Sequence, residues 1–79
     1  MTQTITGQHT HATLGVFDYE ATYDVRHPAS TWWIDWSGSA TGGGRVLTLS
    51  GGSIELIVGS AAAAPIVLHK QIRKEIDAL

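Results

Sequence analysis

The feature that most constrains the fold of this chain is a long period-two alternation in residues 14–25. One parity is aromatic or apolar, and the other begins with Leu14 and Val16 and then turns polar from Asp18 onward. The apolar set is Phe17, Tyr19, Ala21, Tyr23 and Val25. Alternation of this length, rich in aromatic residues, predicts an antiparallel strand with one buried face.

A second aromatic strand is expected directly after this one. Pro28 favours a turn and lacks the N–H that a ladder needs, so the first strand should end near Arg26. In residues 32–37 one face carries Trp32, Ile34 and Trp36, and the other carries Trp33, Asp35 and Ser37. We therefore expect a hairpin whose cross-strand aromatic pairs each contribute about 0.2–1 kcal/mol.

The middle of the chain predicts a second hairpin. Two aliphatic runs, residues 45–49 and 54–58, flank the segment Ser-Gly-Gly-Ser at residues 50–53. A glycine pair between two such runs favours a tight hairpin turn. The glycine run at residues 42–44 marks a loop before it.

The C-terminal segment predicts an amphipathic helix of about four turns. Pro65 fits the first turn of such a helix, where its missing N–H costs little. The apolar stripe should face the sheet at Trp32, Ile34 and Trp36. This stripe is formed by Leu68, Ile72, Ile76 and Leu79.

Together these patterns predict an α+β fold, with an antiparallel sheet of three to five strands in two hairpins and one C-terminal helix packed on one face. Residues 12–79 are assigned to a single domain and residues 1–11 to a polar N-terminal arm. Residues 2–13 are Thr-rich, and their composition leaves open whether they form a short edge strand or a loose arm.

Composition excludes several classes of protein. The 79 residues include no cysteine, which excludes disulfides, thiolate metal sites and a cysteine nucleophile. Five basic residues against seven acidic ones give no basic stripe, so direct nucleic-acid binding is not expected. The start of the chain lacks a secretory pattern, and the apolar run at 61–68 is too short for a membrane span. A cytoplasmic protein without membrane contact is expected.

No motif in the sequence predicts catalysis. The glycine runs at 42–44 and 51–52 lack the Lys-Ser/Thr pair of a phosphate-binding loop. No serine lies in a Gly-x-Ser-x-Gly context, and a chain this short has little material for a closed pocket after its core is filled. We therefore expect a protein that is not an enzyme and has no cofactor.

Histidines suggest a metal site as a less favoured alternative. His9 and His11 are two residues apart, so on a strand they would face the same side. His27 and Asp18 are candidates for further ligands. The clear four-ligand spacing of a structural zinc site is missing, and a solvated tail also contains such histidines. Metal is therefore not assigned.

The strongest candidate contact surface is the polar face of the aromatic hairpin. It combines a tryptophan with surrounding carboxylates, and tryptophan is enriched in binding hot spots. An ordinary solvated strand face is the competing interpretation. The candidate partner-binding residues are Asp18, Glu20, Asp24, Trp33 and Asp35.

The leading functional hypothesis is a non-enzymatic module that binds another protein stoichiometrically, through this acidic and aromatic face, and works alone or as a homodimer. The expected partner surface is basic. One alternative is a phage or mobile-element accessory protein, anti-CRISPR-like, that inhibits a host nucleic-acid-binding defence complex. Alternate strand residues lie about 6.6–7 Å apart, close to the spacing of phosphates, which permits mimicry. Another alternative is a structural subunit of a homo-oligomeric assembly.

Overall fold

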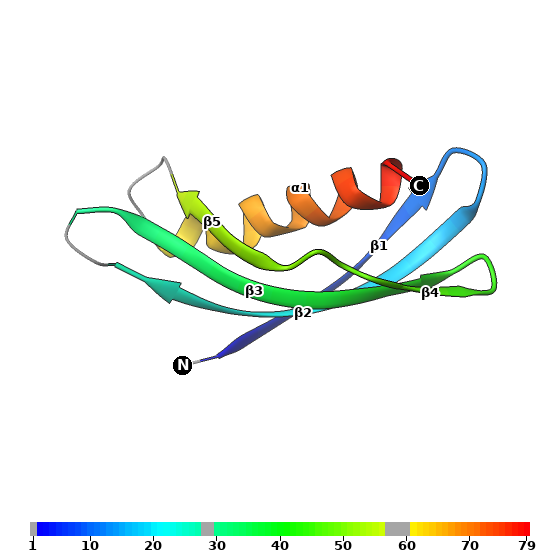
Figure 1. Ribbon diagram of the computed structural model, residues 1–79. Helices are drawn as coiled ribbons and strands as arrows, with labels where there is room; N and C mark the ends of the chain where they lie inside the picture. Colours follow the sequence, from blue (N-terminus) through cyan, green and yellow to red (C-terminus); the bar gives the residue numbers. More distant parts are fainter. Residues whose placement is uncertain (1, 28–29, 57–60) are drawn as a thin grey trace.

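The computed structural model describes residues 2–27, 30–56 and 61–79. Within these residues the chain forms five strands, a 3-10 turn and one α-helix (Figure 1). The elements are β1 (Gln3–His11), β2 (Gly15–Arg26), β3 (Trp32–Gly42), β4 (Arg45–Thr48), β5 (Gly52–Leu56), η1 (Ala61–Ala63) and α1 (Ala64–Asp77).

All strand pairs in the sheet are antiparallel, in the order β1-β2-β3-β4, and β5 also pairs with β3. The helix α1 lies along one face of the sheet (Figure 1), and its backbone comes nearest to β1 and β2. The α+β fold, the antiparallel sheet and the single C-terminal helix packed on one face are confirmed.

The N-terminal segment forms an edge strand. All nine residues of β1 pair with β2, from Gln3 opposite Tyr23 to His11 opposite Gly15. Of the two alternatives for this segment, the structure therefore has the strand rather than the loose arm. The strand is also longer than the short one expected, because all nine of its residues are in register with β2.

The aromatic hairpin of β2 and β3 is confirmed. Tyr23 pairs with Trp36 and Val25 pairs with Ile34, and these four residues face the helix side of the sheet. Strand β2 ends at Arg26, as the position of Pro28 indicated. Residues 28–29 lie outside the described residues.

The prediction of a second hairpin, between residues 45–49 and 54–58, is wrong. Strands β4 and β5 both pair with β3, at Ser39 opposite Thr48 and at Trp36 opposite Gly52. Two residues of β3, 37 and 38, are opposed by three, 49–51, so this stretch forms a bulge in one long edge segment. Residues 57–58 lie outside the described residues.

The tight turn lies earlier in the chain than expected. Gly42 pairs with Arg45, and the two residues between them, Gly43 and Gly44, have φ of 56° and 76°. Positive φ at both central residues is the geometry of the preferred two-residue hairpin turn, and it matches the twist of the strands. The glycine run at 42–44 therefore joins β3 to β4 rather than forming an open loop.

The core lies between the sheet and α1. Leu68, Ile72 and Ile76 are fully buried and belong to one cluster with Ile34 and Trp36. The inward stripe of the helix is thus confirmed at three positions and wrong at Leu79, which is 43% exposed. Leu79 lies beyond Asp77, the last residue of α1, so it does not continue the helical period.

Trp32 was expected to be buried and is only half-buried. It lies near the end of the hairpin, where its ring stacks on His27 with centroids 3.9 Å apart. Trp36 is the buried tryptophan of this strand, at 6% exposure.

Within the part of the chain that the structure describes, none of the helical segments has the length and hydrophobicity of a membrane span.

Candidate functional site

The five predicted partner-binding residues share one face of the sheet, the side away from α1, which we call the outer face. Directly opposite residues of an antiparallel pair project to the same side. Asp24 is opposite Asp35, Arg26 is opposite Trp33, and Trp33 is opposite Glu55. The alternation on β2 places Asp18 and Glu20 on the same side as Asp24. The geometry therefore brings together Asp18, Glu20, Asp24, Trp33 and Asp35.

An open groove of about 530 Å³ crosses the outer face over β1, β2 and β3. We call it the outer groove. Two of its lining side chains, Asp18 and Glu20, are predicted site residues. Gln8 donates from Nε2 to Asp18 Oδ1 at 2.6 Å. The remaining polar side chains that line the groove are Thr6, Ser39 and Thr41.

Sequence reasoning missed the groove residues of β1 and β3. Thr6 and Gln8 occur in a segment with one large apolar residue, Ile5, so their period-two alternation had no apolar partner set to reveal it. Ser39 and Thr41 continue the alternation of Trp33, beyond the aromatic stretch that carried the argument. Their parity relative to Trp33 was the signal that could have identified them.

Charge is unequally distributed between the two sides of the molecule. Five of the seven carboxylates in the chain lie on the outer face, namely the four predicted ones and Glu55. The guanidinium of Arg26 opposes them on that face. Three of the five basic residues lie exposed on α1. These are Lys70, Arg73 and Lys74. The outer face is therefore more acidic than the net charge of −2 suggests.

Asp35 is the most strongly bonded carboxylate on the outer face. Arg26 donates to it from Nε at 2.5 Å and from a terminal nitrogen at 3.1 Å, and Ser53 Oγ donates at 2.6 Å. The hydrogen bond from Arg26 and then that from Ser53 lower the pKa of Asp35, and the same contact raises the pKa of Arg26. The charge of Asp35 is thus locally compensated.

Trp33 lies beside this ion pair. The guanidinium carbon of Arg26 is 5.7 Å from the centroid of the Trp33 ring, and Trp33 is half-buried. The ring of Trp33 is therefore partly covered by Arg26. Asp18 and Glu20 are exposed in the groove, while Asp24 is half-buried and accepts from Thr2 Oγ1 at 3.3 Å.

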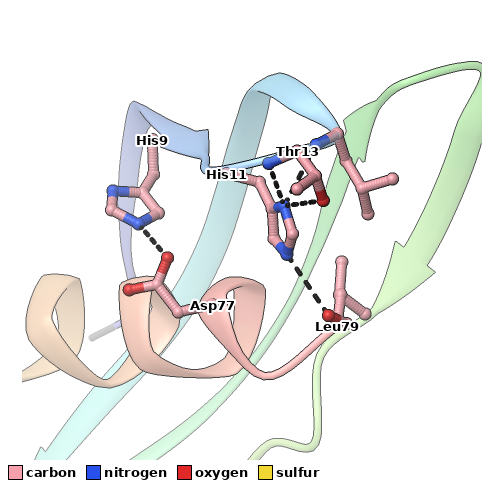
Figure 2. A network of polar contacts seen from close by, with 6 residues as sticks. His9, His11, Thr13, Asp77 and Leu79 are labelled. Atoms are coloured by element: carbon pink, nitrogen blue, oxygen red, sulfur yellow. Dashed lines mark hydrogen bonds and ion pairs between the residues drawn. The ribbon is translucent and has the colours of Figure 1, made fainter.

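The histidines proposed as metal ligands lie on the other side of the sheet. His9 Nε2 is 2.7 Å from Asp77 Oδ1, and His11 Nε2 is 3.3 Å from the backbone oxygen of Leu79 (Figure 2). Asp18 is on the outer face, and His27 stacks on Trp32, so the suggested ligands do not converge. Among the described residues, no group of three His, Asp or Glu side chains is placed to hold a metal ion.

His11 instead organises the turn between β1 and β2. Its Nδ1 accepts from the backbone N–H groups of Thr13 and Leu14, both at 3.1 Å (Figure 2). An accepting Nδ1 carries no hydrogen, so the ring hydrogen is on Nε2, which donates to the oxygen of Leu79. His11 thus links the turn to the end of α1 and has a structural function.

Comparison of the chain with protein-family models, with curated proteins and with solved structures gives no match. The outer face is therefore interpreted from its own chemistry. It presents carboxylates, hydroxyls and amides in an open groove, and such groups accept hydrogen bonds from cationic side chains.

Proposed function

We propose that this chain is a non-enzymatic protein-binding module whose outer face binds a basic surface of another protein. The observation that supports the proposal best is the concentration of carboxylates on the outer face, with three of the basic residues on the opposite side, on α1. A partner with exposed Lys or Arg side chains is attracted to one side of the molecule and oriented by it.

The outer groove is the proposed centre of contact. The exposed carboxylates of Asp18 and Glu20 receive cationic side chains of the partner, and charge-assisted hydrogen bonds of this kind are stronger than neutral ones. The hydroxyls of Ser39 and Thr41 add uncharged hydrogen bonds along the β3 side of the groove. Asp35 contributes less charge, because Arg26 and Ser53 already compensate it.

A titration with a hexa-arginine peptide, followed by NMR, tests this proposal. The expected result is a set of chemical-shift changes on β1, β2 and β3 around the outer groove, with little change on α1. The paired substitution Asp18→Asn and Glu20→Gln should weaken binding about tenfold, close to 1.4 kcal/mol. Glu75→Gln is the control, because it removes a carboxylate from α1 whose contacts, with Ser50 and Gln71, lie outside the outer groove. Shift changes centred on α1, or equal weakening by the control, would contradict the proposal.

A second candidate function is inhibition of a host nucleic-acid-binding defence complex through mimicry of a phosphate backbone. One observation favours it: Arg26, which follows the acidic row of β2, turns its guanidinium to Asp35 and so does not neutralise Asp18 and Glu20. Alternate residues of that row are about 6.6–7 Å apart. The test is competition with duplex DNA for such a complex. Competition that survives Asp18→Ala with Glu20→Ala would exclude mimicry by this row.

A further inference from the structure

The free edge of β1 is the least protected part of the sheet. Among the described residues β1 has one neighbouring strand, β2, so the backbone groups on its other side have no ladder partner. The strand runs for nine residues, Gln3–His11, without a bulge in its pairing. It contains no Asp, Glu, Lys, Arg or Pro, which are the residues that usually block pairing at an edge.

The opposite edge of the sheet has the protections that β1 lacks. It is divided between β4 and β5, with a bulge between them, and Gly51 and Gly52 have φ of 68° and 110°. Arg45 and Glu55 place charges along it. Bulges and charges of this kind prevent a second strand from adding to an edge. The contrast identifies β1 as the edge that can accept a further strand.

We propose that β1 pairs antiparallel with β1 of a second copy of this chain, which joins two five-stranded sheets into one continuous sheet. The midpoint of Gln3–His11 is Gly7, so a two-fold axis at Gly7 pairs all nine residues of both strands. This register places Thr4 opposite Thr10 of the second copy and Thr6 opposite Gln8. These cross-strand pairs combine uncharged hydrogen-bonding groups, which is favourable in a sheet.

The distribution of charge favours a second copy at this edge. The acidic outer residues begin on β2, so in the paired sheet two neutral strands separate the carboxylate rows of the two copies. Three strand spacings give about 14 Å between those rows, more than the screening length of about 8 Å at physiological ionic strength. Self-pairing at β1 therefore keeps the carboxylate rows of the two outer faces apart. On the inner side, half-buried Ile5 lies opposite His9 of the second copy and is covered further.

Pairing at β1 has a consequence for the outer face. Both copies keep their outer grooves on the same side of one sheet, because the two-fold axis is perpendicular to it. A dimer then presents two acidic grooves to one partner, and two linked sites bind more tightly than one. The dimer itself does not depend on the proposed function, because it rests on β1 alone.

Sedimentation equilibrium of the full chain over a concentration series tests the proposal. The expected mass at high concentration is twice the 8.4 kDa of one chain. Association should persist as salt rises, because neutral strands form the contact. A single-chain mass into the hundred-micromolar range would overturn the proposal, as would association that disappears in high salt, which indicates contact between the acidic face and α1.

A pair of matched variants locates the interface. Thr4→Lys with Thr10→Lys places two lysines opposite each other at each end of the paired strands, and it should raise the dimer Kd by about tenfold or more. Val46→Lys with Thr48→Lys adds the same charge on exposed positions of β4, at the other edge, and should leave the Kd unchanged. The reverse pattern, or equal effects of the two variants, would place the interface elsewhere and overturn the proposal.

Hydrogen exchange provides a measurement that does not depend on folding of the variants. In the unmodified chain, amides of β1 should exchange more slowly at concentrations where the dimer forms than after dilution. The amides of β4 and β5 should exchange equally in both conditions. Concentration-independent exchange throughout β1 would contradict pairing at this edge.

Discussion

The hydroxyl of Tyr19 on β2 lies 2.5 Å from Nδ1 of His69 on α1. The two rings also meet edge to face, with centroids 5.6 Å apart. To reach the helix, the Tyr19 ring extends over β1 at Gly7, where an added Cβ would lie 2.5 Å from the hydroxyl oxygen. One side chain therefore contacts three elements, and Gly7 provides the space for it.

Removing this hydroxyl should weaken the contact between sheet and helix. Tyr19→Phe keeps the ring and leaves the polar atom of half-buried His69 without its partner, so we expect a loss of about 1 kcal/mol in unfolding free energy. Urea denaturation measures it. Tyr23→Phe is the control, because the Tyr23 hydroxyl bonds to exposed Gln3 at 3.2 Å and should contribute less. An equal loss in both variants would contradict a special contribution of His69.

Gly7→Ala should cost about 1–3 kcal/mol, because the new methyl group displaces the Tyr19 ring from its position over β1. The same substitution in a Tyr19→Leu background should cost much less, since the shorter side chain does not extend over residue 7. A double-mutant cycle by chemical denaturation measures the coupling between the two positions. Additive losses would show that the ring does not require the glycine.

Two isoleucines on α1 give a matched test of the core. Ile72 is fully buried and Ile66 is 72% exposed. Ile72→Ala should lower the unfolding free energy by about 2–4 kcal/mol through lost burial and the cavity left behind. Ile66→Ala should change it by less than about 0.5 kcal/mol. Similar losses in thermal and urea unfolding for the two variants would mean that the helix faces the sheet with a different side.

The contacts of Asp35 predict a dependence of stability on pH. Arg26 and Ser53 lower the pKa of Asp35 in the folded chain, so its ionised form stabilises the fold above the ordinary carboxyl pKa of about 3.9. This contribution is lost as pH falls through that value and then through the lower folded one. The stability difference between the unmodified chain and Asp35→Asn should therefore shrink below about pH 4. A difference that stays constant in acid would contradict the assignment.

An NMR titration of the Asp35 carboxyl identifies the cause of the shift. In Arg26→Ala the pKa should rise toward its ordinary value, because the larger contribution comes from the hydrogen bond with Arg26. In Ser53→Ala it should rise less. A larger effect of Ser53→Ala would reverse the order of the two causes.

Much of the sheet could be predicted because β2 and the start of β3 carry an unambiguous alternation of large apolar and polar residues. The position of the hairpin turn could not, because residues 42–44 and 51–52 are both glycine-rich. Which of them forms a turn depends on pairing with β3, a non-local contact. The inward stripe of α1 was predicted correctly except at Leu79, its last member. That position failed because the apolar period gives no signal for where α1 ends.

The candidate site, too, could be predicted from the sequence only in part. The shared outer face of Asp18, Glu20, Asp24, Trp33 and Asp35 follows from strand parity alone. The bonds from Arg26 and Ser53 to Asp35 do not, since Ser53 is contributed by β5 and its distance from Asp35 depends on the bulge. The groove depends on β1 as well, whose pairing with β2 could not be predicted from its polar composition.

The tryptophans of β3 give the final prediction, since Trp33 and Trp36 are on opposite faces of one strand. Trp36 is 6% exposed in the core, so Trp36→Ala should lose about 3–5 kcal/mol of unfolding free energy. Trp33→Ala should leave the fold largely intact, because Trp33 lies on the outer face and is not part of the core cluster. It should instead weaken binding of the hexa-arginine peptide by about 0.5–1 kcal/mol, because the ring attracts a guanidinium much as it now attracts Arg26. Circular dichroism and the NMR titration separate the two effects. Full peptide affinity in a folded Trp33→Ala variant would limit the contact surface to the groove of Asp18 and Glu20.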